Sequence, residues 1–162
     1  DAFSYNAYFK SSVIYNLLRD YFGKEKYKGI MKEFINRWNG KHPTPYDFFF
    51  TFNEASGENL EWFWQPWFFD KGYPDQTISE VKKENGKNVI VIKNSGTLPI
   101  PVELTINYSD GSADKITKKM DVWKNGIKQI EITDESGKEI KSIVLGSDVI
   151  PDINPTGNIF NP

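Results

Sequence analysis

Few side chains in this sequence have the chemistry for a catalytic centre. His42 is the single histidine among the 162 residues, and the sequence has no cysteine. Protein zinc sites are built mainly from His and Cys, so neither a histidine pair nor a thiolate can be assembled here. His42 lies between Lys41 and Pro43 in a predicted connection between helices, and we interpret it as a surface or packing imidazole. We predict no metal ligand and no cofactor-binding residue in this chain.

Two carboxylates and one phenol are the remaining residues that could do chemistry. Glu58 and Glu61 are spaced to share one face at a helix start, where their charge would stabilise the helix dipole. Tyr8 stands where the first helix should begin, and a phenol there can donate a hydrogen bond into a cleft while its ring packs on the helix. From residue type alone, we favour a structural role for all three. The sequence contains no Gly-rich phosphate loop and no Gly-x-Ser-x-Gly turn.

The aromatic segment from Leu60 to Phe69 has two interpretations. Its rings could form a stacking platform for sugars or bases, or they could be the core of a small helical layer. We favour the core, because a layer of this size needs large side chains to bury enough surface. Three tryptophans at 62, 64 and 67 cannot all lie on one helical face, so one should point away from it.

Helical spacing dominates the first half of the chain. Apolar residues recur at steps of three and four over residues 9–21 and 27–38, and a glycine follows each run. Thr44-Pro45 is typical of an N-cap and first helical residue, which predicts a third helix to Ser56. A fourth helix should start after Asn59, with Pro66 straining its interior.

The pattern changes near residue 76, where apolar residues begin to alternate with polar ones. Asn-Gly, Asp-Gly and Ser-Gly pairs break the alternation at short intervals, as in tight hairpins. Of the 25 aromatic residues, 22 lie before this point, which implies two different cores. We therefore predict an α+β protein: about four helices in residues 1–76, then an antiparallel immunoglobulin-like β-sandwich in residues 77–162. About seven strands are expected in residues 77–146, and the Pro-rich tail from Ser147 should hold no further element.

Charge and hydropathy exclude several classes of partner. With 20 basic and 22 acidic side chains, and no run of Lys or Arg longer than two, nucleic-acid binding is not indicated. No apolar stretch approaches the roughly 20 residues of a membrane span, so no membrane partner is expected. The first residue is Asp1 rather than Met, which we interpret as a processed or excised piece of a longer protein.

Three segments of the first half carry a resemblance to a known family. They are Tyr8-Phe9-Lys10-Ser11 with the helix that follows, Pro43-Thr44-Pro45-Tyr46-Asp47-Phe48, and Leu60-Glu61-Trp62-Phe63-Trp64 with Trp67 and Gly72-Tyr73-Pro74. In order and spacing they resemble the end of the catalytic domain of the aminopeptidase N family, the zinc aminopeptidases that include leukotriene hydrolase. The second half resembles the β-sandwich that follows this domain, and Asp152-Ile153-Asn154-Pro155 is similar to the chain end of bacterial members.

The resemblance implies a function that the residues alone do not. Tyr8 takes the position of the family's tyrosine, whose hydroxyl stabilises the oxyanion formed when water attacks the peptide carbonyl. Ser11 stands where the family has glycine, and the His-Glu-x-x-His zinc motif is absent. The parent would thus be a zinc aminopeptidase acting on peptides, and this chain alone should be inactive. Its implied partner is the upstream catalytic lobe of the same polypeptide.

Two alternatives remain open at this stage. The chain could be a non-catalytic binding module with a Trp-rich surface for glycans or proteins, or part of a pseudo-peptidase that has lost its zinc ligands. If the upstream lobe is missing, Phe3, Tyr5, Tyr8 and part of Trp62–Trp67 should be exposed and favour self-association. The lack of cysteine fits either redox compartment, and the resemblance to bacterial members favours export.

Overall fold

The computed structural model describes residues 10–162, which form two compact units, one up to Phe69 and one from Asp70 to Pro162. The first is helical and the second is built from two antiparallel sheets, so the predicted α+β class is confirmed. The division falls before the predicted boundary at residue 76. The reason is that the segment between them belongs to the second unit: Gly96 N–H donates to the Asp75 carbonyl at 3.0 Å, and Thr97 N–H donates to the Tyr73 carbonyl at 3.1 Å.

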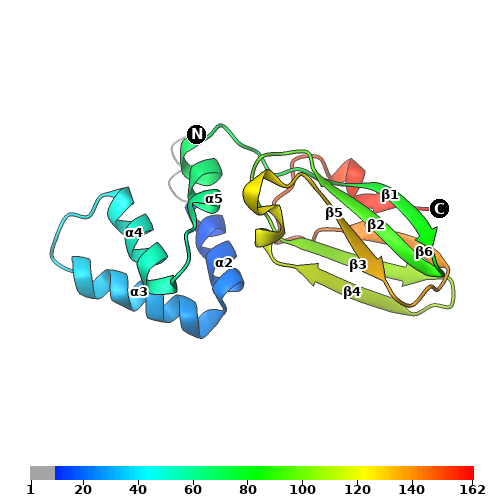
Figure 1. Ribbon diagram of the computed structural model, residues 1–162, viewed down its shortest axis with the longest axis horizontal. Helices are drawn as coiled ribbons and strands as arrows, with labels where there is room; N and C mark the ends of the chain where they lie inside the picture. Colours follow the sequence, from blue (N-terminus) through cyan, green and yellow to red (C-terminus); the bar gives the residue numbers. More distant parts are fainter. Residues whose placement is uncertain (1–9) are drawn as a thin grey trace. The chain divides into compact units, whose positions relative to one another are not determined.

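The helical unit has four α-helices in the described residues, and their ends follow the predicted signals. They are α2 (Ser11–Phe22), α3 (Lys24–Trp38), α4 (Pro45–Ser56) and the short α5 (Glu61–Trp64), which continues into the π-helix η2 (Gln65–Phe69) (Figure 1). Gly57 closes α4 in the left-handed conformation at φ 74°, which a residue without Cβ adopts at no steric cost. Pro66, predicted to strain the fourth helix, lies in the π-helical segment.

The core of the helical unit is mainly aromatic. Phe52, Phe63 and Trp64 are buried together with Leu17 and Leu18 of α2. The Phe52 ring lies edge-on to the Trp64 indole at a centroid distance of 5.9 Å. The preference for a core over a sugar platform is therefore confirmed for Trp64 and Trp67, which are buried, whereas Trp62 is half-buried. Ile35, part of the predicted apolar run of α3, is exposed.

The second unit is a sandwich of two antiparallel sheets. The strands are β1 (Gln76–Glu84), β2 (Lys87–Asn94), β3 (Val102–Tyr108), β4 (Ala113–Lys118), β5 (Gln129–Asp134), β6 (Ile140–Leu145) and β7 (Ile159–Phe160). One sheet has the order β1-β2-β5 and the other β4-β3-β6-β7 (Figure 1). The 3₁₀-helix η3 (Met120–Gly126) connects β4 to β5 across the two sheets.

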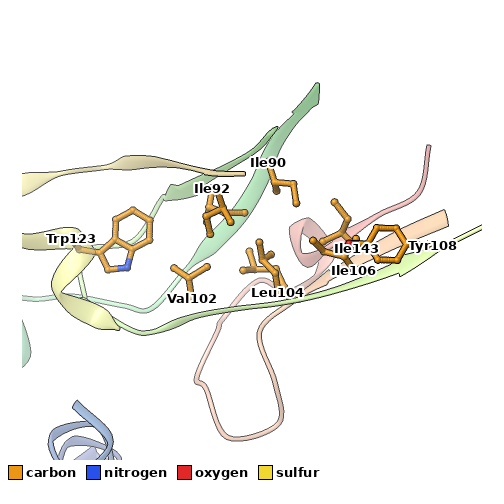
Figure 2. Close-up of a cluster of buried hydrophobic side chains, with 10 residues drawn as sticks. Ile90, Ile92, Val102, Leu104, Ile106, Tyr108, Trp123 and Ile143 are labelled. Carbon is orange, nitrogen blue, oxygen red and sulfur yellow. The ribbon is translucent and has the colours of Figure 1, made fainter. Parts of the chain in front are cut away.

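Alternation along the strands builds the core of the sandwich. Val102, Leu104, Ile106 and Tyr108 are buried on one face of β3, with the residues between them more exposed. Figure 2 shows these side chains facing Ile90 and Ile92 of the other sheet, with Trp123 closing one end of the cluster. The Trp123 indole donates to the Ile100 carbonyl at 2.9 Å, which satisfies its buried N–H.

The prediction for the tail was wrong. Six of the strands lie within residues 76–145, and the seventh, β7, lies in the tail after the 3₁₀-helix η4 (Pro155–Asn158). Strand β7 pairs with β6 through Ile143 with Phe160 and Val144 with Ile159. The tail is ordered by long-range contacts, such as the 3.0 Å hydrogen bond from Gln76 N–H to Asp152 Oδ2, which proline and glycine content cannot reveal.

No helix among the described residues is long and apolar enough to cross a membrane.

Candidate functional site

The helical unit contains a groove of about 490 Å³ formed by α4, α5 and η2. We call it the aromatic groove, and it is lined by Tyr46, Phe49, Phe50, Asn53, Asn59, Glu61, Trp64, Gln65 and Phe69. Most of its apolar surface is aromatic, and its polar surface consists of amide side chains, one phenol and one carboxylate. It is the candidate binding surface of this unit.

Helix α4 supplies one wall of the aromatic groove because its lining residues share a helical face. Tyr46, Phe49, Phe50 and Asn53 follow the i, i+3, i+4, i+7 spacing. The start of the helix is fixed by a capping box, in which Asp47 Oδ2 accepts the Thr44 N–H at 2.7 Å and Thr44 Oγ1 accepts the Asp47 N–H at 3.4 Å.

Asn53 joins the two walls of the groove. Its Oδ1 accepts hydrogen bonds from the Trp64 indole N–H at 3.0 Å and from the Leu60 backbone N–H at 3.2 Å. The Trp64 ring stacks on Phe49 at a centroid distance of 4.8 Å and an interplanar angle of 26°. The Asn53 amide oxygen and this stacked ring pair therefore help to hold α5 on α4, together with the contacts of Phe48 and Phe52 with the Trp64 ring.

The rim of the groove is formed by exposed rings. Phe50 is 66% exposed, Tyr46 55% and Phe69 48%, which is unusual for side chains of this size. The π-helix brings Phe69 back over α4, where its ring stacks on Tyr46 at 5.8 Å and 26°. The exposed apolar surface of the groove is therefore formed by Tyr46, Phe50 and Phe69, and not by Trp64 and Trp67, which are buried.

The chemistry of the aromatic groove is that of binding. Among the described residues that line it, Glu61 is the single carboxylate and is exposed, and the other polar side chains are neutral. Within residues 10–162, no three His, Cys, Asp or Glu side chains are grouped so that they could hold a metal ion. The lining residues that the structure describes can stack on planar or apolar groups and accept hydrogen bonds, but they include no nucleophile.

The candidate residues from the sequence analysis do not come together in one site of the described structure. Tyr8 lies outside the described residues. His42 is exposed in the loop before α4. Glu61 is in the first turn of α5, as predicted, but Glu58 is not paired with it: Glu58 Oε2 accepts the Tyr21 hydroxyl at 2.7 Å. The expectation that both carboxylates serve one helix start was therefore wrong for Glu58, which bonds to a side chain of α2 instead.

Sequence reasoning missed the wall that α4 contributes. The aromatic run of Phe48, Phe49 and Phe50 was passed over because consecutive rings show no single buried face. The spacing from Tyr46 to Asn53 was the available signal.

Comparisons with known proteins give a family-model match for the first part of the chain and a likeness in fold. Residues 1–67 match the family model described as "Peptidase family M1 domain". The chain is also similar to the crystal structure of Legionella pneumophila aminopeptidase A in complex with aspartic acid, with a TM-score of 0.65 and 22% sequence identity over 86% of this chain. The match covers 16% of that longer chain, and at this identity it shows the fold alone. A comparison with curated proteins finds no match.

Proposed function

We propose that this chain is the end of the catalytic domain, with the following β-sandwich, of a zinc-dependent aminopeptidase, because residues 1–67 match the model of the peptidase family M1 domain. Its reaction is the hydrolysis of N-terminal residues from peptides. The observation that carries the proposal is the agreement between sequence and structure: the family match ends at residue 67, and the compact helical unit ends at Phe69.

The residues described here do not fit a zinc ion. His42 is exposed, and no suitable group of His, Cys, Asp or Glu surrounds it in residues 10–162. We propose that, in the parent enzyme, the zinc ligands come from another part of the polypeptide, because this sequence has one histidine and no His-Glu-x-x-His motif. We therefore expect the chain alone to have no peptidase activity.

Tyr8 is the catalytic residue that we assign to this chain, by its resemblance to the family's tyrosine. Its hydroxyl donates a hydrogen bond to the oxygen of the scissile carbonyl as negative charge develops there. Helix α2 begins three positions later, at Ser11, and is anchored by the buried side chains of Ile14, Leu17 and Leu18. A well-anchored helix next in sequence supports this role, because an oxyanion donor must be held in place before the reaction.

The partner that we propose is the upstream lobe of the same catalytic domain. The exposed rings of Tyr46, Phe50 and Phe69 support it, because apolar surface of this kind is usually covered by another part of the protein. Without that lobe, the same surface favours self-association of the chain. Sedimentation velocity at increasing concentration tests this, and a Phe50→Ser variant should associate less than the wild type.

A second candidate function is a binding module for glycans, favoured by the rings and amide side chains of the aromatic groove. Its surface would be Phe- and Tyr-rich rather than Trp-rich, since Trp64 and Trp67 are buried. Titration with oligosaccharides, followed by tryptophan fluorescence, to which Trp64 beneath the rim contributes, separates this function from the peptidase. Saturable quenching supports the module, and an unchanged spectrum contradicts it.

The strand order of the two sheets supports the assignment of the second unit as an immunoglobulin-like domain. Strands β1, β2 and β5 form one sheet, as A, B and E do in that fold, and β3, β6 and β7 follow the order of C, F and G. Strand β4 pairs with β3 at the edge of the second sheet.

The experiment that tests the proposal begins with the coding sequence upstream of Asp1. It should encode a His-Glu-x-x-His motif, and its absence would favour a pseudo-peptidase. The full-length polypeptide should then contain zinc and hydrolyse aminoacyl p-nitroanilides, whereas the 162-residue chain should do neither. Zinc-dependent hydrolysis by this chain alone would contradict the proposal.

A further inference from the structure

A second cavity, of about 460 Å³, lies in the sandwich where the C-terminal tail meets β1 and β6. The 3₁₀-helix η4, red in Figure 1, contacts both strands. The polar residues that line this cavity are Gln76, Ser147, Asp148, Asp152 and Asn158. All of these residues lie outside residues 1–67, which match the peptidase family model, so a role for this cavity does not depend on the proposed function.

Asp152 is the centre of this polar cluster, and its oxygens are already used as acceptors. Oδ2 accepts the Gln76 N–H at 3.0 Å and the Asn158 side-chain amide at 3.1 Å, and Oδ1 accepts the Asn154 N–H at 2.8 Å. The donors near Asp152 are thereby committed to one carboxylate.

Two further oxygens, one on Asn158 and one on the residue that precedes Gln76, are buried and have no hydrogen-bond partner among the described residues. Asn158 is 7% exposed, and its Oδ1 accepts no hydrogen bond, although its amide nitrogen bonds to Asp152. Asp75 precedes Gln76 in the chain, and its Oδ1 is also buried without a partner. Leaving such acceptors unsatisfied costs about 1–3 kcal/mol each, so each oxygen calls for a donor or a cation.

The charge of the cluster is also uncompensated. Burial, and secondly the nearby charge of Asp152, raise the pKa of Asp75 above its ordinary value. Among the ion pairs of the described residues, none involves Asp75, Asp148 or Asp152. A water molecule could donate to the two free oxygens, but only a cation would offset the two carboxylates as well.

We propose that Asp75, Asp152 and the Asn158 amide oxygen bind a divalent cation of the calcium type. All three are oxygen ligands, which Ca²⁺ accepts from carboxylates, amide side chains, backbone carbonyls and water. The ion would join the start of β1 to the C-terminal tail, two segments far apart in the sequence. Two carboxylates are few for a calcium site, so the affinity belongs in the weak range, with a Kd of about 10⁻⁴–10⁻³ M.

The test is calorimetric titration of the full 162-residue chain, stripped with a chelator, with CaCl₂ and separately with MgCl₂. Calcium should bind with a Kd in the range above and raise the thermal midpoint of the sandwich. Magnesium should do so less, because it requires near-ideal octahedral geometry and gives up its water reluctantly. Absence of calcium binding up to 10 mM (roughly tenfold above the weaker limit) overturns the proposal.

Three variants locate the site. Asp75→Asn keeps the shape of the side chain but removes its charge, and should weaken calcium binding about tenfold or more, since affinity follows ligand charge. Asn158→Asp should tighten calcium binding and lower the thermal midpoint in chelator. Glu139→Gln removes a charge from an exposed side chain elsewhere in the same unit and should leave the Kd unchanged. Equal calcium affinity in wild type, Asp75→Asn and Asn158→Asp would show that calcium binds elsewhere and overturn the assignment.

Discussion

Asn53→Ala is the substitution that should most damage the helical unit without removing any apolar side chain. Asn53 Oδ1 is the acceptor for the Trp64 indole N–H and for the Leu60 backbone N–H. Alanine at this position leaves both donors without that acceptor. Because Leu60 is fully buried and Trp64 is 4% exposed, water has little access to replace the lost oxygen.

The expected magnitude follows from the two donors. A buried donor left unpaired costs about 1–3 kcal/mol, so the pair gives about 2–6 kcal/mol. The better helix propensity of alanine in α4 offsets about 0.5 kcal/mol of this loss. We therefore expect the free energy of unfolding of the helical unit to fall by about 2–5 kcal/mol.

Urea unfolding of the full chain, followed by tryptophan fluorescence, measures this loss. Four of the five tryptophans lie in the helical unit, so the signal reports mainly on that unit. The matched control is Asn59→Ala, which removes one hydrogen bond to the exposed Glu61 N–H and should cost about 0.5–1 kcal/mol. If Asn53→Ala costs no more than Asn59→Ala, the claim that the Asn53 amide oxygen is a main contact between α4 and α5 is wrong.

Two further predictions concern backbone space and pH. Gly96→Ala should destabilise the sandwich by about 1–3 kcal/mol, because a Cβ there would lie 2.2 Å from the Tyr73 carbonyl oxygen. Gly29→Ala, in an open part of α3, should instead stabilise the helical unit by about 0.5–1 kcal/mol. Thermal melts of both variants check the signs of the two changes. Hydrogen bonds from Ser112 are the first cause that lowers the pKa of Asp110 from 3.8 to about 2. Because the pKa of Asp110 is lower in the folded state, the carboxylate contributes stability that is present above the unfolded-state pKa and is lost as the pH falls from about 4 to 2. The thermal midpoint of Asp110→Asn should therefore fall less steeply than that of the wild type over this interval. Parallel curves for the two proteins would contradict this prediction.

Local signals predicted most of the helical unit. The start of α4 was predictable because Thr44, Pro45 and Asp47 act within one turn, and its end because Gly57 provides a left-handed residue at the right place. The π-helix was not predictable, because Pro66 indicates strain but does not say how the chain relieves it. The aromatic groove was missed for a related reason: which of several consecutive rings is buried depends on contacts with α5, not on α4 alone.

Long-range contacts explain what was missed in the sandwich. Alternation predicted β2, β3 and β5, because the period of two is present in their own sequences, most clearly in β3, where every second residue is buried. Strand β7 has only two residues, and it exists because Asp152 and its hydrogen bonds fix the tail against the start of β1. Glu58 shows the same limit, since its bond to Tyr21 joins positions 37 residues apart in the chain.

The central claim is that this chain supplies Tyr8 as an oxyanion donor to a peptidase whose metal ligands lie elsewhere in the polypeptide. Its most direct test is the kcat of the full-length enzyme carrying Tyr8→Phe, with Tyr15→Phe, an exposed tyrosine of α2, as the control. The account predicts that Tyr8→Phe lowers kcat by about 10²–10³ with KM little changed, and that Tyr15→Phe leaves both near the wild-type values. An unchanged kcat in Tyr8→Phe would contradict it.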